Sequence, residues 1–235
     1  MSNGIKVKKR NGRGTEALNL EKMHKMVDEA TQGLAGVSAS QVEIQSGIQF
    51  YDGITTAEIQ EILIKSASDL IDLDHPNYQF VAARLLLFSI RKSLYGRSRE
   101  LPKLEDHIVK CVTQEVYDGD IYSKYSKEDI EKANGYIDHN RDFLFTYAGL
   151  RQVADKYLVQ DRSTGQVYET PQFMYMMIAL TIFAEYPKET RLNYVRRYYD
   201  AISRHSINIP TPIMAGVRTP IRQFASCVLV DADDT

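Results

Sequence analysis

The sequence places a thiol directly after a run of hydroxyl groups and arginines near its C-terminal end. Residues 210–220 contain three prolines and a glycine, which disfavour helix and predict irregular backbone. The apolar run 227–230 is typical of a short buried strand. Cys227 is therefore expected at the start of a strand, behind a loop whose hydroxyls could hold a polar substrate.

A thiol at this position has two interpretations. Free cysteines are among the most frequently buried side chains, so Cys227 could be a packing residue of the strand. An accessible thiol could instead reduce a substrate and end in a disulfide with a second cysteine. The other cysteine, Cys111, lies among apolar residues at helical spacing and is expected in a core. This sequence therefore offers no evident second cysteine to act as the redox partner of Cys227.

The pattern P-T-P-I-M-x-G-x-R-T-P-x-R-Q-F-x-S-C over residues 210–227 resembles the start of the catalytic barrel in the large subunit of class I aerobic ribonucleotide reductases. These oxidoreductases convert ribonucleotides to deoxyribonucleotides for DNA replication. The resemblance implies that Cys227 is a redox-active catalytic residue. It implies substrate contacts from Thr211 and Ser226, and contacts to a specificity effector from Asp234 and Thr235. Arg218 and Arg222 are expected to tie the loop down, without a role in the chemistry.

Other parts of the reductase pattern do not occur in this sequence. It lacks the Asn-x-Cys-x-Glu segment, the C-terminal cysteine pair and the tyrosine pair of the radical path. The resemblance therefore implies a second large-subunit chain that carries the remaining barrel and cysteines, as in a naturally split subunit, although a fragment fits equally. It also implies a small subunit with the radical cofactor, thioredoxin or glutaredoxin as reductant, and an oligomer.

Basic residues also gather near the N-terminus, around the hairpin signal Asn11–Gly12. Phosphate groups require several converging cations, and Lys92 near the end of a later helix could add one. Basic residues on an exposed strand are more often solvated surface than a phosphate site, and no P-loop pattern is present. The cluster on the hairpin comprises Lys6, Lys8, Lys9, Arg10 and Arg13.

The segments V-K-K-R-N-G at 7–12 and N-L-E-K at 19–22 resemble an ATP-cone, the regulatory domain at the N-terminus of many ribonucleotide reductases. The resemblance covers residues 5 to about 95. It implies ATP or dATP, with Mg²⁺, as allosteric effector, and no metal cofactor within this chain. Gln60 and Ser89 stand where bacterial relatives often carry histidines. The implied pocket residues are Lys9, Glu16, Ala17, Leu18, Asn19, Leu20, Glu21, Lys22, Thr56 and Lys92.

Local signals predict the elements that position these residues. Asn19 is expected to cap a helix, and Ser40-x-x-Glu43 and Thr55-x-x-Glu58 indicate capping boxes of two more. A fourth helix should stop at Gly96. We expect a mainly α chain with three parts. They are an ATP-cone of a small hairpin and four helices at 1–95, a helical part at 96–209, and the substrate loop with the first strand of an α/β barrel, completed by another chain, at 210–235.

The middle of the chain is expected to be helical apart from one hairpin around Ser163-Thr164-Gly165. A helix beginning at Pro171 is apolar nearly all round and should be buried, with an amphipathic helix at 191–203 as its partner. Residues 137–142 are expected to form a loop with exposed charge. His139 lies between acidic residues there, but a surface cluster is favoured over a metal site or a catalytic base.

Composition narrows the functional classes. The chain has 235 residues, a formal net charge of −2 and 43% hydrophobic residues. A net charge this close to zero gives no electrostatic field that would attract nucleic acid, and the apolar runs are too short to cross a membrane. Two cysteines do not make a disulfide framework, so a reducing cytoplasm is expected. The competing interpretations are a stand-alone ATP-cone sensor or regulator without catalysis, and a purely structural assembly component.

Overall fold

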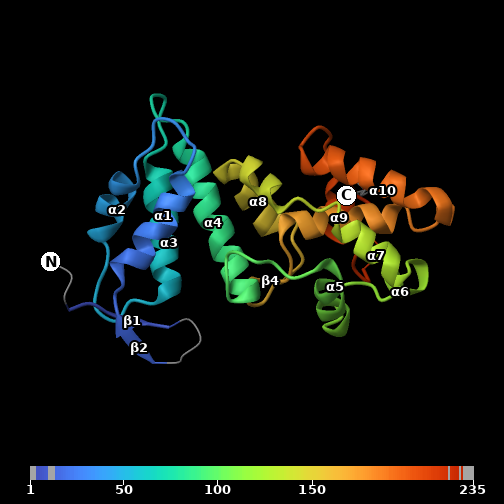
Figure 1. Ribbon diagram of the computed structural model, residues 1–235, viewed down its shortest axis with the longest axis horizontal. Helices are drawn as coiled ribbons and strands as arrows, with labels where there is room; N and C mark the ends of the chain where they lie inside the picture. The colour runs from blue at the N-terminus through green and yellow to red at the C-terminus, as the bar shows by residue number, and fades with distance from the viewer. Residues whose placement is uncertain (1–3, 10–13, 222, 228, 230–235) are drawn as a thin grey trace, which may run out of the picture. The chain divides into compact units, whose positions relative to one another are not determined.

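The computed structural model describes residues 4–9, 14–221, 223–227 and 229 of the chain. They are mainly helical, with two small two-stranded sheets (Figure 1). The chain divides into two compact units. The first takes residues up to Glu100 together with Phe143–Gln152, and the second takes Leu101–Asp142 together with residues from Val153 onward. Predictions for Arg10, Asn11, Gly12, Arg13, Arg222, Val228, Val230, Asp234 and Thr235 fall outside the described residues.

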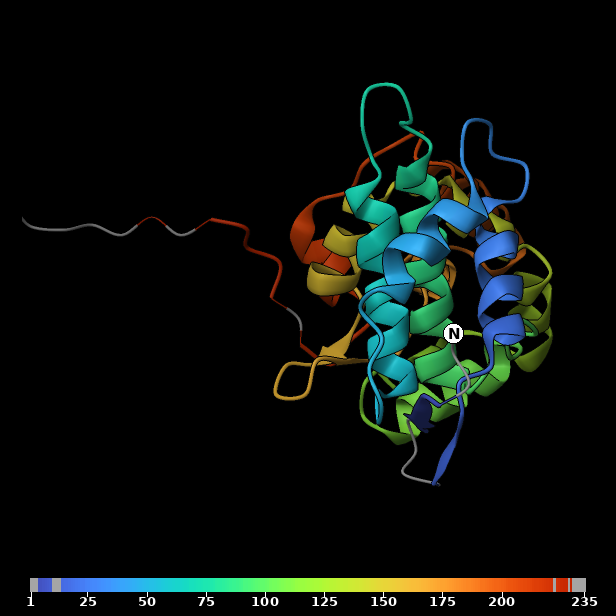
Figure 2. The same cartoon turned by 90° about the vertical axis from the view of Figure 1, so that its left-hand side faces the viewer.

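Up to Glu100, the described residues of the first unit form a hairpin followed by four helices, as the sequence predicts. Strands β1 and β2 pair antiparallel, with Val7 opposite Glu16. The other edge of β1 is covered, because the Lys8 amide donates to the Ile54 carbonyl at 2.9 Å. Figure 2 shows α1, α3 and α4 running alongside one another. The elements are β1 (Lys6–Lys8), β2 (Thr15–Ala17), α1 (Leu20–Thr31), α2 (Ala39–Gly47), α3 (Thr56–Asp69) and α4 (Tyr78–Tyr95).

Capping side chains set the helix starts in this unit. Asn19 accepts the backbone N–H of Lys22 at the start of α1, and Thr55 and Glu58 form a reciprocal capping box on α3. Both were predicted. The predicted cap of α2 at Ser40 is wrong: Ser38 is the cap, with φ −134° and ψ 123°. Its extended backbone suits a capping residue, whereas Ser40 already lies within the first turn.

A residue far along the sequence completes the first unit. The ring of Phe143 lies 5.3 Å from the guanidinium carbon of Arg84 and 5.8 Å from that of Arg91. It also meets the edge of Phe88, with ring centroids 6.3 Å apart. All three partners belong to α4, so cation–π and aromatic contacts tie Phe143 to that helix.

The later part of the chain is built around α9. This helix is buried almost throughout, as its apolar sequence predicts, and α10 packs on it through Val195, Tyr199 and Ile202. Among the described residues, no helix is long and apolar enough to cross a membrane. The elements are α5 (Leu104–Thr113), α6 (Ile121–Lys124), α7 (Lys127–Asn134), the 3₁₀ helix η1 (His139–Leu144), α8 (Tyr147–Lys156), β3 (Gln160–Asp161), β4 (Gln166–Val167), α9 (Pro171–Ile182), α10 (Lys188–Ser203) and α11 (Thr211–Gly216).

Two predictions about residues 137–216 are wrong. Residues 139–144 form a 3₁₀ helix rather than a loop with exposed charge, and Asp142 is buried, where it accepts a 2.9 Å hydrogen bond from Gln172. Residues 211–216 form the short helix α11 despite the prolines. The prolines are compatible with it because Pro210 is the capping residue and Pro212 lies in the first turn, where no intrahelical donor is needed.

The buried strand expected at 227–230 is not formed by its described residues. Cys227 and Leu229 lie outside any strand and are exposed, Leu229 by 98%. A strand is stable only when a neighbouring strand satisfies its backbone groups, and the described residues pair none with this run. An apolar run alone therefore does not make a strand here.

Candidate functional sites

The first unit contains a cavity of about 180 Å³ between the hairpin and three helices. The strand β2 supplies Glu16 and Ala17, and the N-terminal turn of α1 supplies Lys22. Thr56 stands at the first position of α3, and Lys92 lies in the last turn of α4. Helix N-termini carry positive partial charge, so two such ends at one cavity favour an anionic ligand.

Three lysines act on the Glu16 carboxylate, and two of them, Lys22 and Lys92, line the cavity with it. Lys9 pairs with Glu16 at 3.1 Å, and this hydrogen bond, with the charges of Lys22 and Lys92, holds the pKa of Glu16 below its usual range. Positive charge is therefore in excess around the cavity. An incoming phosphate could replace the Glu16 carboxylate as the partner of Lys9.

Most of the predicted nucleotide-binding residues lie together. Leu18 and Asn19 also line this cavity. Leu20 and Glu21 instead line a neighbouring, more open cavity with His24 and Glu43. Sequence reasoning did not assign the apolar half of the pocket, although the helical spacing of Met23 and Met26 could have indicated part of it. That half consists of Val7, Met23, Met26 and Ile59, with the buried carboxamide of Gln60 beside them.

The size of the cavity limits what it encloses. Pockets that hold whole small ligands usually measure about 300–1,000 Å³. A cavity of about 180 Å³ can enclose only part of a ligand as large as a nucleoside triphosphate. Its apolar residues suit the planar face of a base, and Lys22 and Lys92 in the same lining suit charged groups.

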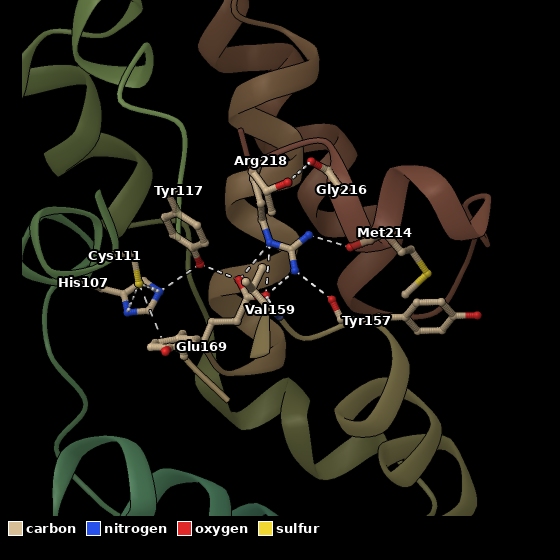
Figure 3. A network of polar contacts seen from close by, with 11 residues as sticks. His107, Cys111, Tyr117, Tyr157, Val159, Glu169, Met214, Gly216 and Arg218 are labelled. Carbon is tan, nitrogen blue, oxygen red and sulfur yellow. Dashed lines mark hydrogen bonds and ion pairs between the residues drawn. The ribbon is translucent and has the colours of Figure 1, made fainter. Parts of the chain in front are cut away.

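The second unit holds the predicted substrate loop by a buried arginine. Arg218 is 1% exposed, and its Nε lies 2.9 Å and 3.1 Å from the two carboxylate oxygens of Glu169 (Figure 3). Its Nη1 donates to the Met214 carbonyl at 2.5 Å and its Nη2 to the Tyr157 carbonyl at 2.8 Å. The sequence prediction that Arg218 ties the loop down is confirmed.

Glu169 is saturated with donors although it is fully enclosed. Besides Arg218, it accepts the backbone N–H of Val159 at 2.7 Å and the phenol of Tyr117. Burial alone would lower the pKa of Arg218. The attraction and hydrogen bonds of the Glu169 carboxylate outweigh this effect of burial, so the pKa of Arg218 is raised. Buried ion pairs of this kind persist only when further hydrogen bonds satisfy both groups, as they do here.

The protons that each group carries determine which group donates in the remaining hydrogen bonds of this network. Tyr117 has one hydroxyl proton and gives it to Glu169, so His107 Nε2, 3.0 Å from the phenol oxygen, must be the donor to it. Burial lowers the pKa of His107 to about 3, which keeps the imidazole neutral. Cys111 lies 3.8 Å from the Tyr168 carbonyl, and burial raises its pKa to about 12. Cys111 is a packing residue, as the sequence predicts.

The predicted substrate and catalytic residues are presented to solvent. Ser226 Oγ and Cys227 Sγ are 3.7 Å apart and exposed. Thr211 begins α11, and its hydroxyl lies 3.3 Å from that of Tyr157. The described contacts thus join Ser226 to Cys227 and Thr211 to Tyr157. Sequence reasoning did not single out Tyr157, since it lies 54 positions from Thr211 and carries no motif.

Comparisons with known proteins place the chain in a family. Residues 5–93 match the ATP cone domain, and residues 143–222 match the all-alpha domain of ribonucleotide reductase. The chain is 51% identical over 235 residues to ribonucleoside-diphosphate reductase 1 subunit alpha of Escherichia coli. It is 50% identical over 235 residues to the alpha subunit of Haemophilus influenzae. It is 44% identical over 223 residues to that of phage T4.

The two matches define the class of protein: an ATP cone, a domain that binds nucleotide effectors, is joined to a helical domain of ribonucleotide reductase. The chain belongs to the ribonucleotide reductase family and is related throughout its length to the alpha subunits. All of its residues align with the Escherichia coli and Haemophilus influenzae subunits, and 94% align with the phage subunit. It spans about a third of their length, 31%, 31% and 29% respectively.

Proposed function

We propose that this chain contributes effector binding and one redox cysteine to the reduction of ribonucleoside diphosphates. Relationship along the whole chain to reductase alpha subunits is the observation that carries the proposal. The cavity of the first unit binds ATP or dATP, with Mg²⁺ on the phosphates. Thr211 and Ser226 contact substrate, and Cys227 is the reducing thiol. Asp234 and Thr235 contribute to the specificity-effector site.

The reaction determines what else must be present. The ribose 2′-hydroxyl leaves as water and hydrogen replaces it, while two enzyme thiols are oxidised to a disulfide. Cys227 supplies one thiol. Cys111 does not supply the other, because it is enclosed and burial holds its pKa at about 12. The second thiol comes from a further large-subunit polypeptide, which also completes the barrel.

Further partners follow from the same reaction. A small subunit supplies the radical that activates the ribose. Thioredoxin or glutaredoxin reduces the disulfide after each turnover by thiol–disulfide exchange, in a reducing cytoplasm. The working enzyme is therefore an oligomer of unlike chains.

Effector binding is tested on this chain directly. Calorimetry with ATP or dATP and Mg²⁺ should give saturable binding that weakens about 10- to 150-fold in Lys9→Met or Lys92→Met, the range for one hydrogen bond to a charged group. Lys65→Met is the matched control, since Lys65 is exposed on α3 and pairs with Asp69 at 2.9 Å. Equal weakening in all three variants would contradict the cavity as the binding site.

Catalysis is tested in the assembled reductase. Cys227→Ser should abolish deoxyribonucleotide formation and leave nucleotide binding unchanged. Cys111→Ser is the control with the same atomic change, and it should retain turnover if the protein remains folded by circular dichroism. If Cys227→Ser retains full turnover, the catalytic proposal fails. Nucleotide binding would then support the stand-alone sensor.

A further inference from the structure

We infer that Tyr157 forms part of the substrate-binding surface as a hydroxyl pair with Thr211, and that Arg218 and Glu169 are positioning residues for this pair. The inference rests on the proposed role of Thr211 in substrate binding. It adds one substrate-contacting residue, Tyr157, and the buried Arg218–Glu169 ion pair that positions it.

The two hydroxyls come from different elements and meet at the surface. Tyr157 follows the last residue of α8, and Thr211 is the first residue of α11. Their oxygens are 3.3 Å apart, a long hydrogen bond in a solvent-exposed position. Each hydroxyl has one donor and two acceptor sites, so this contact leaves capacity for a ribose hydroxyl or a phosphate oxygen.

Other tyrosines of the same unit differ in this respect. The hydroxyls of Tyr125 and Tyr199 are enclosed and bonded to groups of the interior, at 2.7 Å to the Leu180 carbonyl and 2.7 Å to the Gln172 side chain respectively. They stabilise packing. Tyr157 instead uses its main chain for the interior and directs its hydroxyl to Thr211.

One guanidinium group holds both elements. Arg218 donates to the Tyr157 carbonyl, beyond the end of α8, and to the Met214 carbonyl, within α11. Figure 3 shows these two bonds on one side of the guanidinium and the Glu169 carboxylate on another. The planar, fixed arrangement of donors in arginine sets the separation of the two carbonyls. Glu169 fixes the guanidinium in turn, so the spacing of the hydroxyl pair is set from the interior.

The test measures steady-state kinetics in the assembled reductase, with this chain combined with the remaining large-subunit polypeptide and the small subunit. Tyr157→Phe removes only the hydroxyl and keeps the carbonyl that Arg218 binds. We expect KM for the nucleoside diphosphate to rise about 3- to 10-fold with kcat retained, the range for one neutral hydrogen bond. Tyr122→Phe is the matched control, since Tyr122 is 48% exposed in the same unit, and it should match the wild type.

A double-mutant cycle tests the pairing. If the two hydroxyls bind substrate together, Tyr157→Phe should add little to the loss caused by Thr211→Ala. Arg218→Lys keeps the charge but cannot hold both carbonyls and the carboxylate. It should raise KM at least as much as Tyr157→Phe, and Tyr157→Phe in that background should add little.

The possible results separate the inference from the proposed function. Equal kinetics for Tyr157→Phe and Tyr122→Phe, or additive losses with Thr211→Ala, overturn the inference while the wild type and the inactive Cys227→Ser still support the reductase. If the wild-type assembly forms no deoxyribonucleotide, or Cys227→Ser retains turnover, the proposed function fails and the inference fails with it.

Discussion

Replacing Arg218 by methionine should destabilise the second unit severely. The side chains of Arg218 and Glu169 are both fully enclosed. Of its donors among the described residues, the Glu169 carboxylate would keep the Val159 N–H and the Tyr117 hydroxyl. Removing one partner of a buried ion pair typically costs about 3–5 kcal/mol, because the other charge remains in the interior. That is a large fraction of the about 5–15 kcal/mol that stabilises a typical domain.

The assay must report on the second unit alone. Hydrogen exchange of the α9 amides, followed by mass spectrometry in peptides from that helix, does so because α9 is buried and exchanges when the unit opens. A loss of about 3–5 kcal/mol predicts exchange about 150- to 5,000-fold faster. Arg204→Met is the matched control. Arg204 is exposed and lies 3.9 Å from Asp200, so its loss should change stability by less than about 0.5 kcal/mol.

A double variant sharpens the prediction. Arg218→Met with Glu169→Leu removes both charges, which for an isolated buried pair is often neutral. Here it also removes the acceptor of the Val159 N–H and the Tyr117 hydroxyl. A buried group left unsatisfied costs about 1–3 kcal/mol, so only part of the stability should return. Arg218→Met behaving like Arg204→Met, or full recovery in the double variant, would refute the reasoning.

Three further predictions concern separate residues. The hydrogen bond to Glu43 raises the pKa of His24, so the stability it contributes should be complete below the unfolded pKa of about 6.5 and lost as pH rises through the raised value. An NMR titration of His24 should show this midpoint above 6.5, returning toward it in Glu43→Gln. Thr55→Ala removes half of the α3 capping box and should cost about 0.5–2 kcal/mol in urea unfolding of the first unit; no change would mean that the box is not stabilising. A thiol reagent should modify exposed Cys227 in the native chain and reach Cys111 only on unfolding, so two fast thiols would contradict the enclosed Cys111.

Sequence reasoning succeeded where a few neighbouring residues determine the outcome. The cap at Asn19 and the box at Thr55 depend on side chains within three positions of the backbone groups that they bind. The all-round apolar sequence of α9 likewise predicts burial whatever packs against it. The residues assigned to the nucleotide pocket came from a resemblance, and most of them line one cavity.

Sequence reasoning failed where the residue or strand that an element interacts with is distant in the sequence or absent from the described residues. Glu169 lies 49 positions from Arg218, and nothing near either residue indicates the pairing. The apolar run at Cys227 satisfies the composition of a strand, but a strand also needs a neighbour, which composition does not specify. Asp142 was assigned to the surface as a charged residue, yet the distant Gln172 provides the hydrogen bond that allows its burial.

The position of Phe143 restricts how this regulatory module can be transplanted. Sequence similarity to the ATP cone ends at residue 93, whereas the folded unit also includes Phe143–Gln152. A graft that stops at residue 93 removes the ring lying beside Arg84 and Arg91 of α4. A functional chimera has to bring this ring along or find a substitute in its new host. Recombination between genes would meet the same constraint, since the inheritable segment is longer than the recognisable one.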